Sequence, residues 1–135
     1  MYVVIDTNVI VASLKTRHHD SATVRVMDAV YSGQVTPLVN DEILAEYMEV
    51  LNRPHLKLNP AKCEYIVSLI ADLAERFTRV PIEATMPDED DRVFFEIAIA
   101  GQEIANTHLV TGNAKHYPPA DFVISPAEFC DILGI

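Results

Sequence analysis

The clearest structural signal in this chain is Tyr2-Val3-Val4-Ile5-Asp6-Thr7-Asn8. Its first four residues are apolar and mostly β-branched, which predicts a short strand buried in a sheet. An acid, a hydroxyl and an amide follow this strand directly. Ligands of an open α/β sheet bind beyond the carboxyl ends of its strands, so we expect Asp6 in a metal-binding or phosphate-handling site. The structural alternative is that Asp6 only caps the following helix.

The rest of the chain alternates between short apolar runs and segments with apolar residues at helical spacing. Ser21, Asn40, Asn59-Pro60 and Ser125-Pro126 are helix-start signals, and Gly33 is a helix-end signal. The expected strands cover residues 2–5, 35–39, 79–82, 108–111 and 122–124. The expected helices cover residues 8–15, 21–33, 41–51, 60–77, 88–101 and 126–133, with a short turn at 113–117.

This alternation predicts an α/β fold, a three-layer α/β/α sandwich with a central, mostly parallel sheet. The chain has 135 residues, close to the most common domain size, and neither a linker nor a repeat interrupts it. We therefore expect residues 1–135 to form a single domain. The buried stripe of the helix at 60–77 is expected to consist of Ile66, Leu69, Ile70, Leu73 and Phe77.

The chain carries 20 acids against 10 Lys and Arg, a formal net charge of −10. This sign argues against loose binding of nucleic acid, which usually depends on a basic surface. It does not exclude metal-dependent chemistry on a phosphodiester, because bound cations invert the local potential of a carboxylate cluster. Lys15, Arg17, His18 and His19 form a small basic loop, which we interpret as ordinary surface.

The sequence lacks the features that are typical of membrane, secreted and disulfide-bonded proteins. No apolar run reaches the ~18 residues of a membrane-spanning helix, and the N-terminus lacks the pattern of a secretory signal. Cys63 and Cys130 lie in apolar helical contexts, which favours buried thiols over a disulfide or a zinc site. We expect a cytoplasmic protein without a membrane partner.

Further acids follow Asp6 in segments that reach the same edge of the predicted sheet. Glu46 shares a helical stripe with Glu42 and Glu49, and such a stripe is usually a solvated face. Glu46 is nevertheless adjacent to Tyr47 on the apolar side, so it can border the buried face while the other two glutamates lean outward.

The run Asp88-Glu89-Asp90-Asp91 places four acids in one turn at the start of a helix. The helix dipole stabilises one or two acids there, but four like charges repel unless a cation relieves them. Asp90 and Asp91 are the candidate ligands, and Asp88 is better suited to capping. Asn113, in Thr111-Gly112-Asn113, follows another strand and either contributes to the site or caps the next turn.

Taken together, these motifs resemble those of the PIN-domain family of metal-dependent ribonucleases, in particular the toxins of VapBC-type toxin–antitoxin pairs. The resemblance covers essentially the whole chain. It rests on the first-acid motif at 4–10, the helix at 40–51 that carries Glu46, the acidic turn and apolar helix at 88–98, the Leu109-Val110-Thr111-Gly112-Asn113 segment, and the tail at 117–126.

The resemblance implies an endoribonuclease assisted by Mg²⁺ or Mn²⁺. It makes Asp6 and Asp91 the principal metal ligands, with Asp90 as the alternative third acid, and Glu46 the residue that holds or deprotonates a water. Asn113 stands where many relatives have aspartate, which disfavours tight binding of a second ion. The residues expected to orient water, phosphate or substrate are Thr7, Asn8, Thr111, Asn113 and Lys115.

The resemblance also implies an RNA substrate, a cognate antitoxin and a homodimer. Two other functions are considered. A catalytically inactive PIN-like binding module would agree with Asn113 and with the acidity of the chain. A phosphatase of the haloacid-dehalogenase type would need a second acid where this chain has Asn8, and its usual cap domain would not fit in this length.

Overall fold

A computed structural model describes all 135 residues and contains one five-stranded sheet. The strands are β1 (Tyr2–Ile5), β2 (Thr36–Val39), β3 (Glu75–Arg76), β4 (Thr107–Val110) and β5 (Val123–Ile124). Their order in the sheet is β3-β2-β1-β4-β5, and every neighbouring pair is parallel. The prediction of an α/β fold with a parallel central sheet is confirmed.

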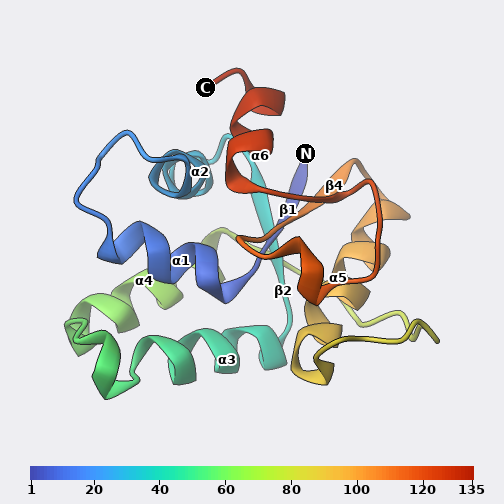
Figure 1. Cartoon of the computed structure of the whole chain (residues 1–135), viewed down its shortest axis with the longest axis horizontal. Helices are drawn as coiled ribbons and strands as arrows, with labels where there is room; N and C mark the ends of the chain where they lie inside the picture. The colour runs from blue at the N-terminus through green and yellow to red at the C-terminus, as the bar shows by residue number, and fades with distance from the viewer.

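Six α-helices surround this sheet (Figure 1). Helix α5 packs across β1, β2 and β4 on one side, whereas α1, α2 and α4 lie on the other side. No helix is both long and apolar enough to cross a membrane. The α-helices are α1 (Thr7–Lys15), α2 (Ala22–Tyr31), α3 (Asp41–Leu51), α4 (Pro60–Leu73), α5 (Arg92–Gln102) and α6 (Pro126–Leu133), and the 3-10 turns are η1 (Pro54–Leu56), η2 (Glu89–Asp91) and η3 (Ala114–His116).

Four of these helices begin at the caps that the sequence predicts. The side chains of Ser21, Asn40, Asn59 and Ser125 each accept a hydrogen bond from a backbone N–H in the first turn that follows. Such a bond typically contributes about 1 kcal/mol, because the first N–H groups of a helix have no partner within it. These caps fix where the connections end and the helices start.

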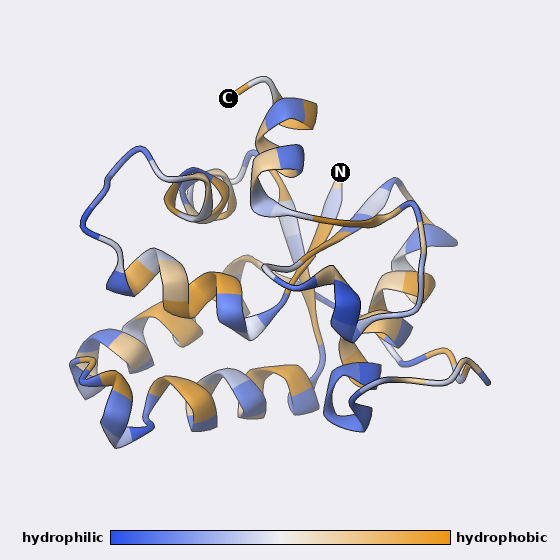
Figure 2. Cartoon of the chain, in the orientation of Figure 1, coloured by the Kyte–Doolittle hydropathy of each residue, from blue (hydrophilic) through white to orange (hydrophobic).

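The centre of the sheet is the apolar core. Val3, Val4 and Ile5 of β1 are at most 2% exposed, and Figure 2 shows the hydrophobic colour concentrated on the strands and on the helix faces turned toward them. The hydroxyl of Tyr47 in α3 donates to the carbonyl oxygen of Ile5 at 2.5 Å, which ties α3 to the end of β1. Both cysteines are free and buried, as predicted.

The third strand lies elsewhere than predicted. Helix α4 ends at Leu73, not at residue 77, and the strand forms at Glu75–Arg76, not at 79–82. The prediction that Phe77 belongs to the helix is therefore wrong. Its ring packs edge-on against Tyr2, with 5.5 Å between ring centroids, because the chain has already turned to pair with β2.

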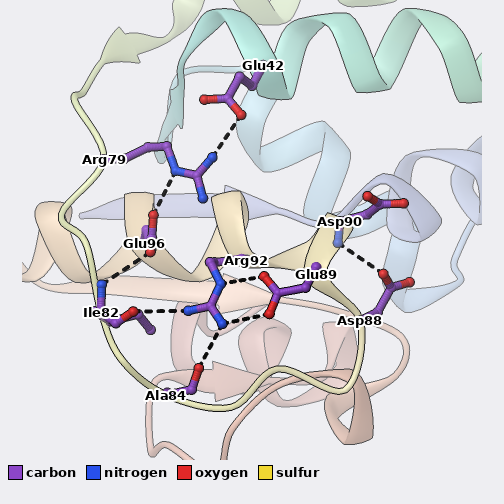
Figure 3. A network of polar contacts seen from close by, with 9 residues as sticks. All are labelled: Glu42, Arg79, Ile82, Ala84, Asp88, Glu89, Asp90, Arg92 and Glu96. Carbon is purple, nitrogen blue, oxygen red and sulfur yellow. Dashed lines mark hydrogen bonds and ion pairs between the residues drawn. The ribbon is translucent and has the colours of Figure 1, made fainter.

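Residues 77–88, where that strand was expected, form an irregular segment held by side chains in place of a strand ladder (Figure 3). Glu96 of α5 is 5% exposed; it accepts from Arg79 Nε at 2.7 Å and from the backbone N–H of Ile82 at 3.2 Å. Arg92 donates to the carbonyl oxygens of Ile82 and Ala84 at 3.0 and 2.9 Å. Polar backbone groups need partners when partly buried, and these two side chains supply them.

The segment leads into the acidic turn, which also differs from the prediction. The helix expected from residue 88 begins at Arg92, after the 3-10 turn η2. Arg92 holds that turn as well, because its guanidinium forms an ion pair with Glu89 at 2.6 Å (Figure 3). Glu96 and Arg92 thus hold the irregular segment and the turn that follows it, which place Asp90 and Asp91 at the edge of the sheet.

Gly101 of α5 is a position where a side chain would clash with the sheet. A Cβ atom there would lie 2.5 Å from Leu38 Cδ1 and 2.7 Å from Thr107 Oγ1. We expect Gly101→Ala to lower the free energy of unfolding by roughly 1–3 kcal/mol, the usual cost of overpacking a core. Urea unfolding measures this, with Ser68→Ala on the exposed face of α4 as the control; equal midpoints would contradict the prediction.

Candidate functional site

The register of β1 and β4 brings two of the predicted site residues together. Ile5 pairs with Val110, so the next residues, Asp6 and Thr111, leave adjacent strands at the same edge of the sheet. The backbone N–H of Asp6 continues the ladder by donating to the carbonyl oxygen of Val110 at 3.0 Å. This edge is the carboxyl end of the parallel strands, where α/β proteins bind their ligands.

The carboxylate of Asp6 is almost entirely buried, and one of its oxygens is saturated with donors. Oδ2 accepts from Thr111 Oγ1 at 2.8 Å, from Tyr117 Oη at 2.9 Å and from Asn8 Nδ2 at 3.3 Å. Oδ1 accepts no hydrogen bond from the protein, and Asp6 does not cap α1 with its side chain. A buried carboxylate needs such compensation, and the arrangement leaves one oxygen free for an external ligand.

Asn8 connects the first-strand motif to the Thr111-Gly112-Asn113 segment. Its side-chain Oδ1 accepts from the backbone N–H of Gly112 at 3.0 Å, while Nδ2 lies within reach of both Asp6 and Thr111. A Cβ atom on Gly112 would lie 3.3 Å from Asn8 Oδ1, so the close approach suits a glycine. Asn8 therefore orients Asp6 and holds the next loop in place.

Glu46 points toward the site from α3, unlike its neighbours in the acidic stripe. Thr7 Oγ1 donates to Glu46 Oε2 at 2.5 Å, whereas Glu42 and Glu49 are exposed. Burial raises the pKa of the Glu46 carboxyl, and the nearby negative charges of Asp6 and Asp90 act in the same direction. The Thr7 hydrogen bond opposes the shift only in part, so Glu46 is a carboxylate predisposed to accept a proton.

Asp91 enters the site from the turn before α5. Burial, followed by repulsion from Asp6, Asp88 and Glu46, raises the pKa of its carboxyl from 3.8 to about 7. Its neighbour Asp90 is exposed, and the side chain of Asp88 accepts from the backbone N–H of Asp90 at 3.0 Å, as expected of a cap. Of the two neighbours, Asp91 is the less exposed.

Asn113 reaches the acidic cluster indirectly. Its side-chain Nδ2 lies 2.9 Å from His116 Nε2, and His116 Nδ1 lies 3.6 Å from Asp91 Oδ2. Asn113 occupies the N-cap position of η3, but its side chain makes no capping hydrogen bond there. Lys115 is exposed and forms no ion pair with these acids. The loop after β4 thus presents an amide, an imidazole and an ammonium group at the margin of the site.

Tyr117 is a site residue that the sequence-based reasoning missed. It is 3% exposed, its ring stacks on Phe95 with 6.4 Å between centroids, and its hydroxyl donates to Asp6. Burial and the charge of Asp6 raise the pKa of this phenol well above its ordinary value, so it stays a neutral donor. The one sequence signal was its place directly before Pro118-Pro119, at the end of the predicted turn.

The donor set of this site consists of oxygen atoms, which are the ligands of hard cations such as Mg²⁺ and Mn²⁺. No three His, Cys, Asp or Glu side chains are close enough to enclose one ion by themselves. The set therefore fits an ion that takes one or two carboxylates and keeps several waters, as Mg²⁺ commonly does. None of the three hollows in the surface is lined by these carboxylates.

The chain is thus an α/β protein that gathers carboxylates at the carboxyl edge of a parallel sheet. The family model described as "PIN domain" matches residues 2–115, and the chain belongs to the PIN domain family.

Comparison with solved structures gives a similar chain in VapBC2 from Rickettsia felis, crystallised bound to a DNA fragment from its promoter. The match covers 93% of this chain and 97% of that chain, with a TM-score of 0.59 and 15% sequence identity. At this identity, the likeness shows the fold alone. A search of curated proteins gives no match.

Because the pKa of Asp91 is raised, we expect the stability of the folded chain to decrease as pH rises. Between pH ~4 and ~7 the folded chain keeps a proton on Asp91 that the unfolded chain has released, so the free energy of unfolding decreases as pH rises through this window. In EDTA at pH 8, we expect Asp91→Asn to gain about 1 kcal/mol after solvent screening, roughly 3–5 °C in Tm. The gain should vanish below pH 4.

Thermal unfolding at pH 4, 6 and 8 checks this expectation. Asp72→Asn on the exposed face of α4 is the matched control, because it removes the same charge outside the cluster. A gain for Asp91→Asn that is equal at all three pH values would contradict the raised pKa of Asp91.

The hydrogen bond from Tyr117 to Asp6 predicts a second effect on stability. Tyr117→Phe keeps the stacked ring but leaves the buried carboxylate without one of its three donors. We expect the free energy of unfolding to fall by about 1.5–3 kcal/mol at pH 7, the range for bonds to charged groups. The exposed Tyr65→Phe is the control in urea unfolding, and equal losses in both variants would count against the role of Tyr117.

Proposed function

We propose that the chain is a divalent-metal-dependent endoribonuclease and the toxin of a toxin–antitoxin pair. The observation that carries the proposal is the Asp6 carboxylate, with Oδ2 held by three donors and Oδ1 left free beside Glu46 and Asp91. Mutual repulsion of acids around a rigid carboxylate is the electrostatic pattern that a bound cation relieves. Membership of the PIN domain family supports the same chemistry.

Each side chain then has a part in hydrolysing a phosphodiester. A bound Mg²⁺ or Mn²⁺ would lower the pKa of a water and stabilise charge on the phosphoryl oxygens. Asp6 and Asp91 would hold the ion, directly or through water, with Asp90 beside them. Glu46 would take the proton of the attacking water while that oxygen bonds to phosphorus and the bond to the leaving oxygen breaks.

The polar residues around the acids would keep this arrangement fixed. Thr7 holds Glu46 Oε2, which leaves Oε1 to face the water. Asn8 and Thr111 orient Asp6, and Asn113 aligns His116 beside Asp91. Lys115, exposed at the margin, would contact a phosphate of the RNA. Because Asn113 adds no charge, one ion suffices for this proposal.

The partners follow from charge and from the likeness to VapBC2. A net charge of −10 and a carboxylate cluster favour an antitoxin that covers the site with a cationic segment. We further propose that residues 1–135 form a single domain and that the protein acts in the cytoplasm as a homodimer. A site without an enclosed cavity favours a polymeric substrate over a small metabolite.

The alternatives are weaker. In a haloacid-dehalogenase-type phosphatase the position of Asn8 would carry a general acid, but both polar atoms of this amide are occupied by Gly112, Asp6 and Thr111. An inactive PIN-like binding module is favoured by Asn113 alone. Retention of the repelling acids argues against it, since their loss would stabilise the fold.

The proposal predicts that cleavage depends on Asp6 and on metal. Asp6→Asn keeps the size of the side chain but removes the charge that holds the cation. We expect its rate of RNA cleavage in Mn²⁺ to fall more than ~100-fold, beyond the 10–100-fold typical of losing an outer partner of a metal ligand. End-labelled structured RNAs measure this, with Asp72→Asn and native protein in EDTA as controls.

Metal binding to the folded state separates the two remaining functions, because a ligand of the native state must raise Tm. A rise in Tm with Mn²⁺ that Asp6→Asn abolishes supports the nuclease. Folded protein with neither cleavage nor a rise in Tm would establish the inactive module.

A further inference from the structure

We propose that residues 15–19 and 53–62, here called the cationic end, dock the backbone of the RNA at a distance from the scissile phosphate. This inference rests on the proposed function, because it assigns the surface that holds the same substrate. It explains how a chain of net charge −10 can bring a polyanionic RNA to a cluster of acids despite their electrostatic repulsion.

Charge is distributed very unevenly along the chain. The cationic end contains five of the ten Lys and Arg residues, three of the five histidines and no acid. The remaining residues therefore carry all 20 acids against the other five Lys and Arg. Phosphate contacts to Lys and Arg supply most of the affinity for nucleic acid, and only this part of the chain offers a concentration of them.

The two segments of the cationic end meet in space. Lys15 Nζ donates to the carbonyl oxygen of Leu56 at 2.8 Å, which joins the end of α1 to the turn η1. Leu14, Leu58 and Lys62 line one small hollow between the two segments. In Figure 1 the connection after α1 and the turn after α3 lie at the same edge of the molecule. They form one surface.

Most of the cations on this surface are free. Arg76, Arg79 and Arg92, elsewhere in the chain, each pair with an acid, and within the cationic end only Arg53 does so, with Glu49. Arg17, Lys57 and Lys62 are exposed and form no ion pair. Asp20 and Glu64 border the surface but pair with none of them. The positive charge is therefore available to a partner.

The backbone at Lys57 adds a second observation. Lys57 is the only non-glycine residue with a positive φ, at φ 55° and ψ 35°. This left-handed conformation favours glycine or asparagine, and a lysine there carries a steric cost. Strained residues are concentrated at binding and switch regions. The positive end of the α4 dipole, at Pro60, lies in the same surface.

The cationic end also lies at a suitable distance from the acidic site for one RNA strand to reach both. Helices α1 and α3 both run from the acidic site to this edge, side by side (Figure 1). From Thr7 to Lys15, α1 spans about 12 Å at 1.5 Å per residue. At ~3.4 Å per nucleotide in a stacked strand, this is about four nucleotides. An RNA longer than that reaches the cationic end while its scissile phosphate lies at Asp6.

The test measures how RNA affinity depends on salt. Lys57→Gln/Lys62→Gln in an Asp6→Asn background removes two candidate phosphate contacts and prevents cleavage. The matched control is Gln34→Glu/Ala127→Glu in the same background, which makes the same change in net charge at exposed positions outside the surface. The probe is a fluorescein-labelled oligouridylate of about 12 nucleotides, titrated in 2 mM Mg²⁺ over a range of NaCl concentrations.

We expect the slope of log K against log[NaCl] to become shallower by about 1.4 in the lysine variant, since each lost contact in a single strand contributes ~0.7. The control should keep the native slope. Equal slopes in the two variants would overturn the proposal. Loss of binding to a poly-glutamate peptide, with the RNA slope unchanged, would also overturn it and assign the surface to an acidic protein.

A cleavage assay keeps this result separate from the proposed function. With Asp6 intact, the lysine variant should cleave a trinucleotide at the native rate and the 12-nucleotide RNA several-fold more slowly. A native chain that cleaves neither RNA, while the slope still changes, refutes the nuclease and supports the docking surface. If the native chain cleaves both RNAs and the lysine variant loses the same fraction of the cleavage rate on each, docking at a distance is refuted.

Discussion

The Asp6 carboxylate is buried at the end of the central strand, and its burial dictates how the surrounding segments are arranged. Asp6 follows β1 into the edge of the sheet, where an unpaired charge would be costly. Three donors from α1, the end of β4 and the loop before β5 converge on its Oδ2 and offset that cost. Because these donors come from segments more than 100 residues apart, the carboxylate also locks both ends of the chain together.

Hydrogen-bond donors attract this carboxylate, and neighbouring acids at short distance repel it. Burial raises the pKa values of Glu46 and Asp91, and the negative charge of Asp6 adds to both shifts. The turn that carries Asp91 keeps its place because Arg92 and the buried Glu96 fix the segment before it (Figure 3). The unpaired cations of the cationic end lie beyond the ends of α1 and α3 that are remote from the acidic site, whereas Lys115 lies at the margin of the site. This separation keeps the negative charge of the acidic site apart from the positive charge of the cationic end.

Sequence patterns were reliable where the determining interactions are local. The caps at Asn40 and Asn59 bond to backbone groups within one turn, so the starts of α3 and α4 were predictable. The strand expected at 79–82 was wrong, because Glu96 and Arg92 of α5, 14 and 10 positions further along the chain, bond to the backbone of Ile82 in place of a neighbouring strand. Tyr117 was missed for the same reason: nothing near it in the chain indicates that its hydroxyl meets Asp6, 111 positions earlier.

The amino-acid sequence was enough to predict the α/β class, the positions of most helices and the acids expected at the carboxyl edge of the sheet. Periodicity, capping and strand composition act over a few residues, and that is enough for those conclusions. Three other features could be seen only in the folded chain: which oxygen of Asp6 stays free, that Asn113 turns toward His116, and that two basic segments form one surface. These features depend on side-chain directions and strand register, which arise only when distant segments pack against the same sheet.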